Sequence, residues 1–269
     1  MASQAMTRNK GWSEIQATLA KAAPQIAAAL PANGSDGRAR AQRAIRCALT
    51  ELRRQPKLLE CDRVSVLGSI VQACQLGLEL DATLGHAYLV PYGAQCQMVI
   101  GYRGLIALAL RSGRIRSIDA EVVYEGDVFE VEQGTTPHLK HVPTMKERGE
   151  IVGAYAIATA NDGSKQFRVL TVDDVAKRRR ASKASKSGPW VDWYDEMVKK
   201  TAVRSLCKLL VQCPEAQRAA VVDEYSEAGY SRETPIDVGY ETIAQGTKRE
   251  DDDVQEPPPV DEREPGGEG

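Results

Sequence analysis

A basic segment in the second half of the sequence has the residue types that bind a phosphate backbone. Residues 164–210 contain 12 Lys and Arg side chains against 5 Asp and Glu. The cations form three groups: KRRR from residue 177, SKASKS from residue 182 and KKTAVRSLCK from residue 199. Such side chains neutralise phosphates without reading base sequence, and binding of this kind weakens steeply with salt. The segment therefore predicts a nucleic-acid surface.

Three cations of the last group recur at every fourth residue. Lys200, Arg204 and Lys208 would stack on one face of a helix, while apolar residues from Tyr194 to Leu206 repeat on roughly the opposite face. We expect the apolar face to pack on a sheet and the cationic face to form an exposed ridge for DNA. The alternative interpretation is a solvated helix face that binds nothing.

Aromatic residues lie beside these cations in the sequence. Trp190 and Trp193 precede the expected ridge. Exposed bases of single-stranded nucleic acid stack on such rings for about 1–3 kcal/mol each. The alternative is that both rings anchor the helix to the core. Tyr88, Tyr92 and Tyr102 allow the same two interpretations.

Residues that could perform bond chemistry are few. The histidines are His86, His138 and His141, and the last two have loop spacing with no neighbouring cysteine, so a zinc site is not expected. No GxxxxGK[ST] phosphate loop occurs, and the paired Asp173 and Asp174 are better explained by a helix N-terminus. We assign no catalytic residue, no metal and no cofactor. A metal-dependent DNA nuclease remains the alternative, because its acids can lie far apart in sequence.

The length and composition are those of a globular protein. The chain has 269 residues, of which 42% are hydrophobic, so it can form one large domain or two small ones. No run approaches the roughly 20 apolar residues of a membrane span, and no secretory signal is present. The 6 cysteines are scattered without a CxxC pair, which fits a reducing cytosol. We expect a cytoplasmic protein with no membrane partner.

The net charge of −2 conceals an uneven distribution. Residues 1–222 carry a net charge of +9, and residues 223–269 carry −11. This division indicates a basic body that binds a polyanion and an acidic tail. From about residue 230 the composition is rich in Glu, Asp, Pro and Gly, which cannot form a buried core, so we expect disorder there.

Hydrophobic periodicity predicts an α+β protein, in which helices flank an antiparallel sheet core. Residues 1–80 have the spacing of amphipathic helices. Short β-like runs at 86–90 and 95–100 flank PYGAQ and predict a hairpin. The sequence GLIALALRSG predicts a short helix that ends at Gly113.

The rest of the sheet is predicted from alternation and turn residues. Residues 114–127 read as a strand, with 127–134 as its antiparallel partner. Residues 137–150 read as a loop, and 151–171 read as a hairpin that turns at NDG.

Helices are expected after the sheet. Thr171 and Asp174 form a capping-box pattern that opens a helix. Residues 181–189 are a flexible Ser/Lys stretch, and 190–213 read as one long helix. The expected regions are 1–64, N-terminal and helical; 65–222, the α+β core; and 223–269, the acidic tail.

Four stretches of the core resemble the RecT family of phage recombinases, which are single-strand annealing proteins. In chain order they are QLGLELD, GHAYLVPYG, MVIGYRGLIALALRSG and GPWVDWYDEMVKKTAVR. The stretches are specific in combination, and the resemblance runs from about residue 65 to about residue 212. The N-terminal helices and the acidic tail fall outside it.

The resemblance implies ATP-independent binding of single-stranded DNA, annealing of complementary strands into a duplex, and promotion of homologous recombination. It also implies a homo-oligomer, either a ring or a helical filament, and a 5′→3′ exonuclease partner. Gly101 and Gly104 would allow close approach either to DNA or to a neighbouring strand, and the alternative is that both serve tight packing between the hairpin and the helix. The residues expected to bind DNA are Tyr102, Arg103, Arg111, Arg114, Arg116, Arg178, Arg179, Arg180, Lys183, Lys186, Trp190, Trp193, Lys199, Lys200, Arg204 and Lys208.

The sequence is compatible with three classes of function. The first is a non-catalytic annealing protein, the second is the metal-dependent nuclease, and the third is an adaptor whose body binds duplex DNA and whose tail recruits basic partners. Longer duplexes, shortened strands and a preference for duplex DNA would distinguish them.

Overall fold

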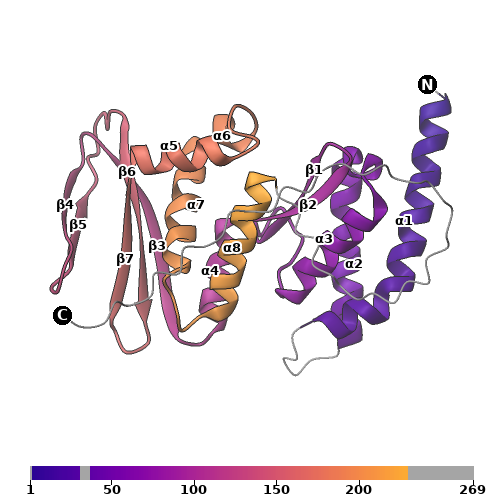
Figure 1. The fold of residues 1–269 in the computed structure, drawn as a ribbon, viewed down its shortest axis with the longest axis horizontal. Helices are drawn as coiled ribbons and strands as arrows, with labels where there is room; N and C mark the ends of the chain where they lie inside the picture. The colour runs from indigo at the N-terminus through magenta and orange to yellow at the C-terminus, as the bar shows by residue number, and fades with distance from the viewer. Residues whose placement is uncertain (1, 31–36, 230–269) are drawn as a thin grey trace, which may run out of the picture. The chain divides into compact units, whose positions relative to one another are not determined.

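The computed structural model describes residues 2–30 and 37–229, in which helices come before and after a mainly β middle segment (Figure 1). The chain divides into two units, Met1–Ile236 and Asp237–Gly269, and all described residues belong to the first. The predicted α+β class is confirmed. The expected disorder of the tail from about residue 230 lies outside the described residues. The helices are α1 (Ala2–Ala29), α2 (Gly37–Arg54), the 3₁₀ helix η1 (Pro56–Glu60), α3 (Arg63–Gln75), α4 (Tyr102–Arg111), α5 (Val172–Ala181), α6 (Pro189–Asp192), α7 (Tyr194–Cys207) and α8 (Pro214–Ala228). The strands are β1 (Ala87–Tyr92), β2 (Gln95–Ile100), β3 (Ile115–Tyr124), β4 (Val128–Glu132), β5 (His138–Val142), β6 (Ile151–Ala160) and β7 (Lys165–Thr171).

The central sheet is antiparallel, in the order β3-β6-β7. Because side chains alternate between the two faces of a strand, Ala154, Ala156 and Ala158 of β6 lie on one face, and all three are buried. Their small size lets α7 pack directly across the middle of the sheet (Figure 1). The predicted hairpin of β6 and β7 is confirmed, as is the capping box in which Thr171 and Asp174 begin α5.

The hairpin of β1 and β2 packs on α3 and α8. Tyr92 pairs with Gln95, so only Gly93 and Ala94 form the turn, and Gly93 adopts a φ of 62°. A two-residue turn of this kind favours glycine, as expected from the sequence. The hairpin prediction is therefore confirmed.

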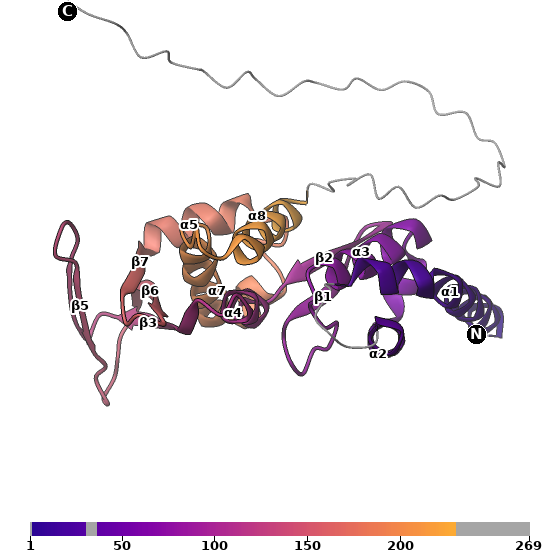
Figure 2. The ribbon, with the colours of Figure 1, turned by 90° about the horizontal axis from the view of Figure 1, so that it is seen from below.

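The pairing expected for β4 is wrong. Val128–Glu132 pairs with β5 at His138–Val142, a segment that was expected to be a loop, and β3 pairs with β6. Both views show the β4–β5 hairpin beside the central sheet, on the side away from α7 (Figures 1 and 2). The alternation in β3 and β4 indicated strands correctly, but alternation does not specify which strand is the partner.

A buried carboxylate fastens the β4–β5 hairpin to the sheet. Asp127 accepts hydrogen bonds from the backbone N–H groups of Tyr124 and Thr144, at 3.0 and 2.9 Å. The guanidinium of Arg148 also donates to it, at 2.5 and 3.1 Å, and this contact holds the pKa of Asp127 well below its usual range. His141 lies between Asp127 and the Tyr155 hydroxyl, at 3.1 and 3.2 Å.

The long helix expected over 190–213 is interrupted. The segment forms α6 at Pro189–Asp192 and α7 at Tyr194–Cys207, with Trp193 between them at φ −140° and ψ 54°. In one continuous helix, Trp190 and Trp193 would have faced the same side. The interruption separates them, so that Trp190 is buried and Trp193 is exposed.

Candidate nucleic-acid interface

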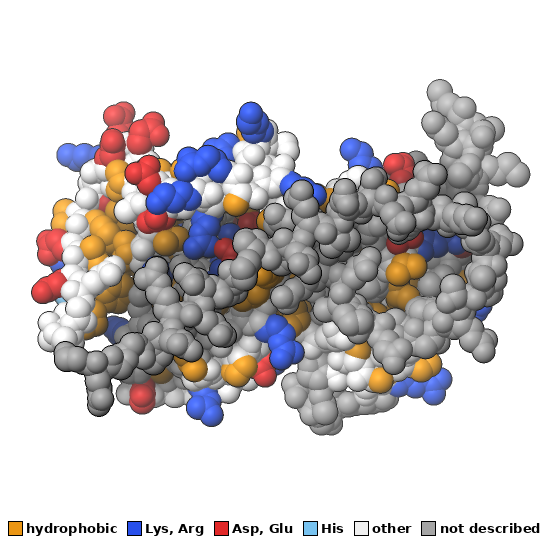
Figure 3. All heavy atoms as spheres, viewed as in Figure 1, with side chains coloured by type: hydrophobic (Ala, Val, Ile, Leu, Met, Phe, Trp, Pro, Cys, Tyr) orange, Lys and Arg blue, Asp and Glu red, His pale blue; other side chains and the backbone are white. Residues whose placement is uncertain are grey.

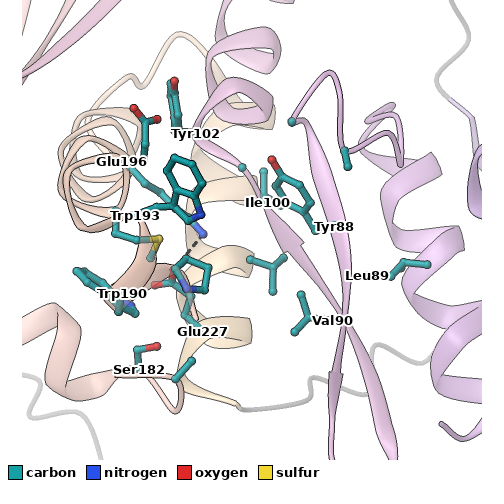
Figure 4. A pocket seen from close by; sticks show the side chains of 18 of the residues that line it. Tyr88, Leu89, Val90, Ile100, Tyr102, Ser182, Trp190, Trp193, Glu196 and Glu227 are labelled. Carbon is teal, nitrogen blue, oxygen red and sulfur yellow. Dashed lines mark ion pairs between the residues drawn. The ribbon is translucent and has the colours of Figure 1, made fainter. Parts of the chain in front are cut away.

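A cavity opens between the β1–β2 hairpin, the start of α4, and the segment that carries α6 and α7 (Figure 4). Its volume is about 620 Å³. Aromatic rings form much of its wall, and Figure 4 shows Trp193 and Tyr88 on opposite sides of it. Trp193 is 67% exposed and Tyr88 is 38% exposed, which is unusual for large aromatic residues. The cavity is therefore a candidate site for a flat ligand.

Two glycines hold the hairpin against α4 and so shape this cavity. A Cβ atom at Gly101 would overlap the backbone of Gly85, and one at Gly104 would overlap the backbone of His86. The Gly101 N–H donates to the His86 carbonyl at 3.0 Å. The packing interpretation of both glycines is therefore the one that the structure supports.

The prediction that Lys200 and Arg204 form an exposed ridge is wrong. Both side chains lie in the interior, with exposed fractions of 6% and 2%. Lys200 Nζ lies 3.0 Å from a carboxylate oxygen of Asp223 and 3.0 Å from one of Glu227. Arg204 Nη1 contacts the same two carboxylates, at 3.0 and 2.6 Å. We call these four residues the buried ion cluster.

Helix α8 supplies the partners that the sequence interpretation missed. Asp223 and Glu227 are spaced by four residues, as are Lys200 and Arg204, so each pair shares one helix face. This matching periodicity was available in the sequence. It was overlooked because the acidic composition placed residues 223–229 with the tail, whereas α8 continues to Ala228.

The electrostatics of the buried ion cluster favour the charged forms. Burial alone would raise the pKa of Glu227, but Lys200 and Arg204 outweigh burial and lower that pKa to about 2. Burial alone would lower the pKa of Lys200, but Asp223 and Glu227 outweigh it and raise that pKa. Asp223 also accepts the Ile100 N–H at 2.9 Å, so the cluster connects α7, α8 and β2.

Other expected DNA-binding cations are bound within the protein. Arg111 donates to the carbonyl oxygens of Leu76 and Gly77, at 3.0 and 2.8 Å, and so closes the end of α3. Arg178 and Lys208 both contact the carboxylate of Glu224. Their internal partners leave these three cations less available to phosphates than the sequence suggested.

Three further expected cations also have contacts within the protein. Arg179 donates to the Ser185 carbonyl at 2.9 Å, and its guanidinium lies 5.4 Å from the centroid of the Tyr194 ring. Lys199 Nζ lies 3.5 Å from Glu121. Lys183 Nζ donates to the Gly229 carbonyl at 3.2 Å.

The remaining expected cations are exposed and form two groups. Arg103 lines the cavity. Arg180 and Lys186 do not line it, but in the sequence they flank Ser182 and Ala184, which do. Figure 3 shows Lys and Arg side chains gathered over α5 and the segment that leads to α6. Arg114 and Arg116, at the start of β3, are exposed but do not line the cavity. The structure therefore brings cations and aromatics together at the cavity, but from fewer residues than expected.

The described part of the chain contains neither a cluster of metal ligands nor a helix that could span a membrane. Across residues 2–30 and 37–229, no group of three His, Cys, Asp or Glu side chains is placed to hold a metal ion. None of the helices in those ranges is both long and apolar enough to cross a membrane.

Known proteins resemble the chain over most of its length. The RecT family model matches residues 42–237. The chain is 46% identical over 208 residues to Protein RecT of Escherichia coli (strain K12), which covers 74% of this chain and 76% of that protein. It is 30% identical over 171 residues to the uncharacterized protein YqaK of Bacillus subtilis (strain 168), which covers 62% of this chain and 58% of that protein. The family match begins within α2 and extends past α8. The resemblance expected from the four stretches, from about residue 65 to about residue 212, is therefore too short at both ends.

Proposed function

The chain belongs to the RecT family, and from that premise we propose that it binds single-stranded DNA and anneals complementary strands without ATP. No covalent bond is made or broken in this reaction. The protein lowers the repulsion between two phosphate backbones and keeps the bases of one strand open to the other. The biological role that follows is homologous DNA recombination.

The observation that carries this proposal is an exposed tryptophan in a cavity bordered by cations. Trp193 offers an open ring face, on which a base can stack regardless of its identity. Arg103 in the cavity wall can neutralise a phosphate that flanks that base, as can Arg180 and Lys186 in the segment that contributes Ser182 and Ala184 to the wall. The combination suits an unpaired strand, because the bases of a duplex are already stacked on one another.

Annealing also requires the strand to be presented over many nucleotides. We propose that protomers assemble into a ring or helical filament, so that the cavities and nearby exposed cations of neighbouring copies follow one strand. The effective concentration of the second strand then rises after its first contact. A 5′→3′ exonuclease that exposes single strands is the partner proposed to act beforehand.

The double variant Arg180→Ala with Lys186→Ala tests the interface. Removal of two phosphate contacts should lower the slope of log affinity against log salt by about 1.4, since each contact to a single strand contributes about 0.7. The measurement is fluorescence anisotropy with a labelled oligonucleotide across a range of salt concentrations.

The matched control for this variant is Lys21→Ala with Lys146→Ala, which also removes two exposed cations. These residues lie on α1 and beyond β5, and neither lines the cavity. The control should keep the wild-type slope. Equal slopes for the wild type and the Arg180–Lys186 variant would reject the proposed interface.

A further inference from the structure

The two ends of the cavity differ in chemistry. Trp193, Tyr88 and Tyr102 lie towards one end, and Trp190, Glu227 and Ser182 lie towards the other (Figure 4). The first group offers ring faces for stacking. The second group offers an indole N–H, a carboxylate and a hydroxyl, and its three side chains belong to buried residues. The Lys183 N–H donates to the Glu227 carbonyl at 3.1 Å, which brings the Ser182 segment and the end of α8 together.

A buried donor at the polar end has no partner. The indole Nε1 of Trp190 makes no hydrogen bond within the described chain, although the side chain is 2% exposed and borders the cavity. Buried donors are nearly always paired in folded proteins, so this N–H is available to an acceptor that enters the cavity. A ligand with an acceptor atom at this end would satisfy it.

Lys200 adds further hydrogen-bonding capacity at the same end. Its ammonium group has three N–H donors, and the carboxylates of Asp223 and Glu227 occupy two directions around it. Lys200 and Glu227 both line the cavity. The polar end thus contains donors and an acceptor close together, as does the pairing edge of a base.

The charges in the wall disfavour a phosphate in the interior. The carboxylates of Glu51 and Glu196 border the cavity and would repel an anion, while the charge of Lys200 in the same wall is balanced by its ion pairs with Asp223 and Glu227. The remaining cation of the described wall, Arg103, is exposed to solvent. A nucleotide would therefore enter with its base inwards and its phosphate outwards.

We propose that the cavity takes one unpaired nucleobase per protomer, stacked between Trp193 and Tyr88, with its hydrogen-bonding edge on Trp190 and Lys200. This inference rests on the proposed single-strand binding and specifies how that site distinguishes unpaired DNA. A base that is already paired cannot offer its edge to the polar end, so the cavity selects single strands. The complementary strand must displace this base from the cavity before that position can pair.

The test compares an oligothymidylate with a strand of the same length made of abasic residues, which has the same phosphates but no bases. Wild-type protein should bind the base-bearing strand about tenfold more tightly, as stacking of one base predicts. Trp193→Ala should bring the two affinities together, and Trp193→Phe should keep most of the difference. Val191→Ala, an exposed apolar neighbour in α6, is the control and should behave as wild type.

A second variant tests whether the base enters the cavity or merely stacks at its mouth. Trp190→Phe removes the N–H but keeps an aromatic ring, and it should weaken binding of the base-bearing strand several-fold while leaving the abasic strand unchanged. Full discrimination in either Trp190→Phe or Trp193→Ala would overturn the base pocket, as would equal binding of both strands by the wild type. Absence of binding to either strand would instead reject the proposed function itself.

Discussion

Lys200 and Arg204 join helix α7 to helix α8, and Lys200 also lines the cavity. Their contacts with Asp223 and Glu227 fix α8 against α7, and the bond from Ile100 extends this connection to the hairpin beneath the cavity. Removal of one member of a buried ion pair leaves the other charge without compensation, which is strongly destabilising. Substitution at these positions therefore tests folding before it tests DNA binding.

Glu227→Gln should destabilise the protein and reduce its sensitivity to acid. The folded state lowers the pKa of Glu227 from 4.5 to about 2, which corresponds to about 3 kcal/mol of stability at neutral pH. Because the pKa is lowered on folding, this contribution is complete above pH 4.5 and is lost as the pH falls towards 2. The variant should be less stable by about that amount at pH 7, as measured by urea unfolding.

The acid limb of the stability curve provides the comparison. Wild-type protein should lose more stability than Glu227→Gln between pH 4.5 and pH 2. Glu215→Gln, which changes an exposed carboxylate on the same helix, should stay within about 0.5 kcal/mol of wild type. Equal stability of Glu227→Gln and wild type at pH 7 would show that the buried ion cluster contributes little.

At the scale of elements, two features depend on contacts that are distant in sequence. The β4–β5 hairpin is held beside the sheet through Asp127, which binds Arg148 and His141 from segments that follow it. The break at Trp193 turns one ring inwards and the next outwards. Both features arise from tertiary packing, which can override local helix and strand preferences.

Asp127→Asn should loosen the β4–β5 hairpin without unfolding the central sheet. The substitution keeps the shape of the side chain but removes the charge that Arg148 and His141 contact. Amide exchange over residues 128–142 should accelerate about tenfold, while β3 and β6 remain protected. Hydrogen–deuterium exchange measures both regions in one experiment.

The control for this variant is Asp119→Asn, an exposed position in β3. It should leave exchange in the hairpin as in the wild type. Unchanged exchange over 128–142 in Asp127→Asn would mean that the aromatic contacts of Phe129 with Tyr155 hold the hairpin on their own.

At the scale of the whole molecule, local signals predicted the architecture well. Turn residues identified the β1–β2 and β6–β7 hairpins, and the capping box identified the start of α5. These features depend on neighbouring residues, which the sequence displays directly. The partner of β4 and the burial of Lys200 depend on segments elsewhere in the chain. Helical spacing alone therefore predicted that the Lys200 face of α7 is exposed, whereas that face is buried.

The candidate site was predicted only in part, for the same reason. Trp193 and Arg103 were identified by type and lie at the cavity. Arg111 and Arg204 were identified by the same reasoning, yet Arg111 donates to the end of α3 and Arg204 is buried against carboxylates. Positive charge in a sequence indicates how much basic character is present, and packing decides which cations remain exposed.

The rate at which complementary oligonucleotides pair is the most direct test of the proposed annealing. Two strands labelled as a fluorescence donor and acceptor are mixed with the purified protein at low salt, first without nucleotide or divalent metal and then with Mg²⁺ or Mn²⁺. An annealing protein should give faster pairing in the absence of ATP and recovery of both strands at full length. Pairing no faster than that of the strands alone, or shortened strands in the presence of metal, would contradict the proposed annealing.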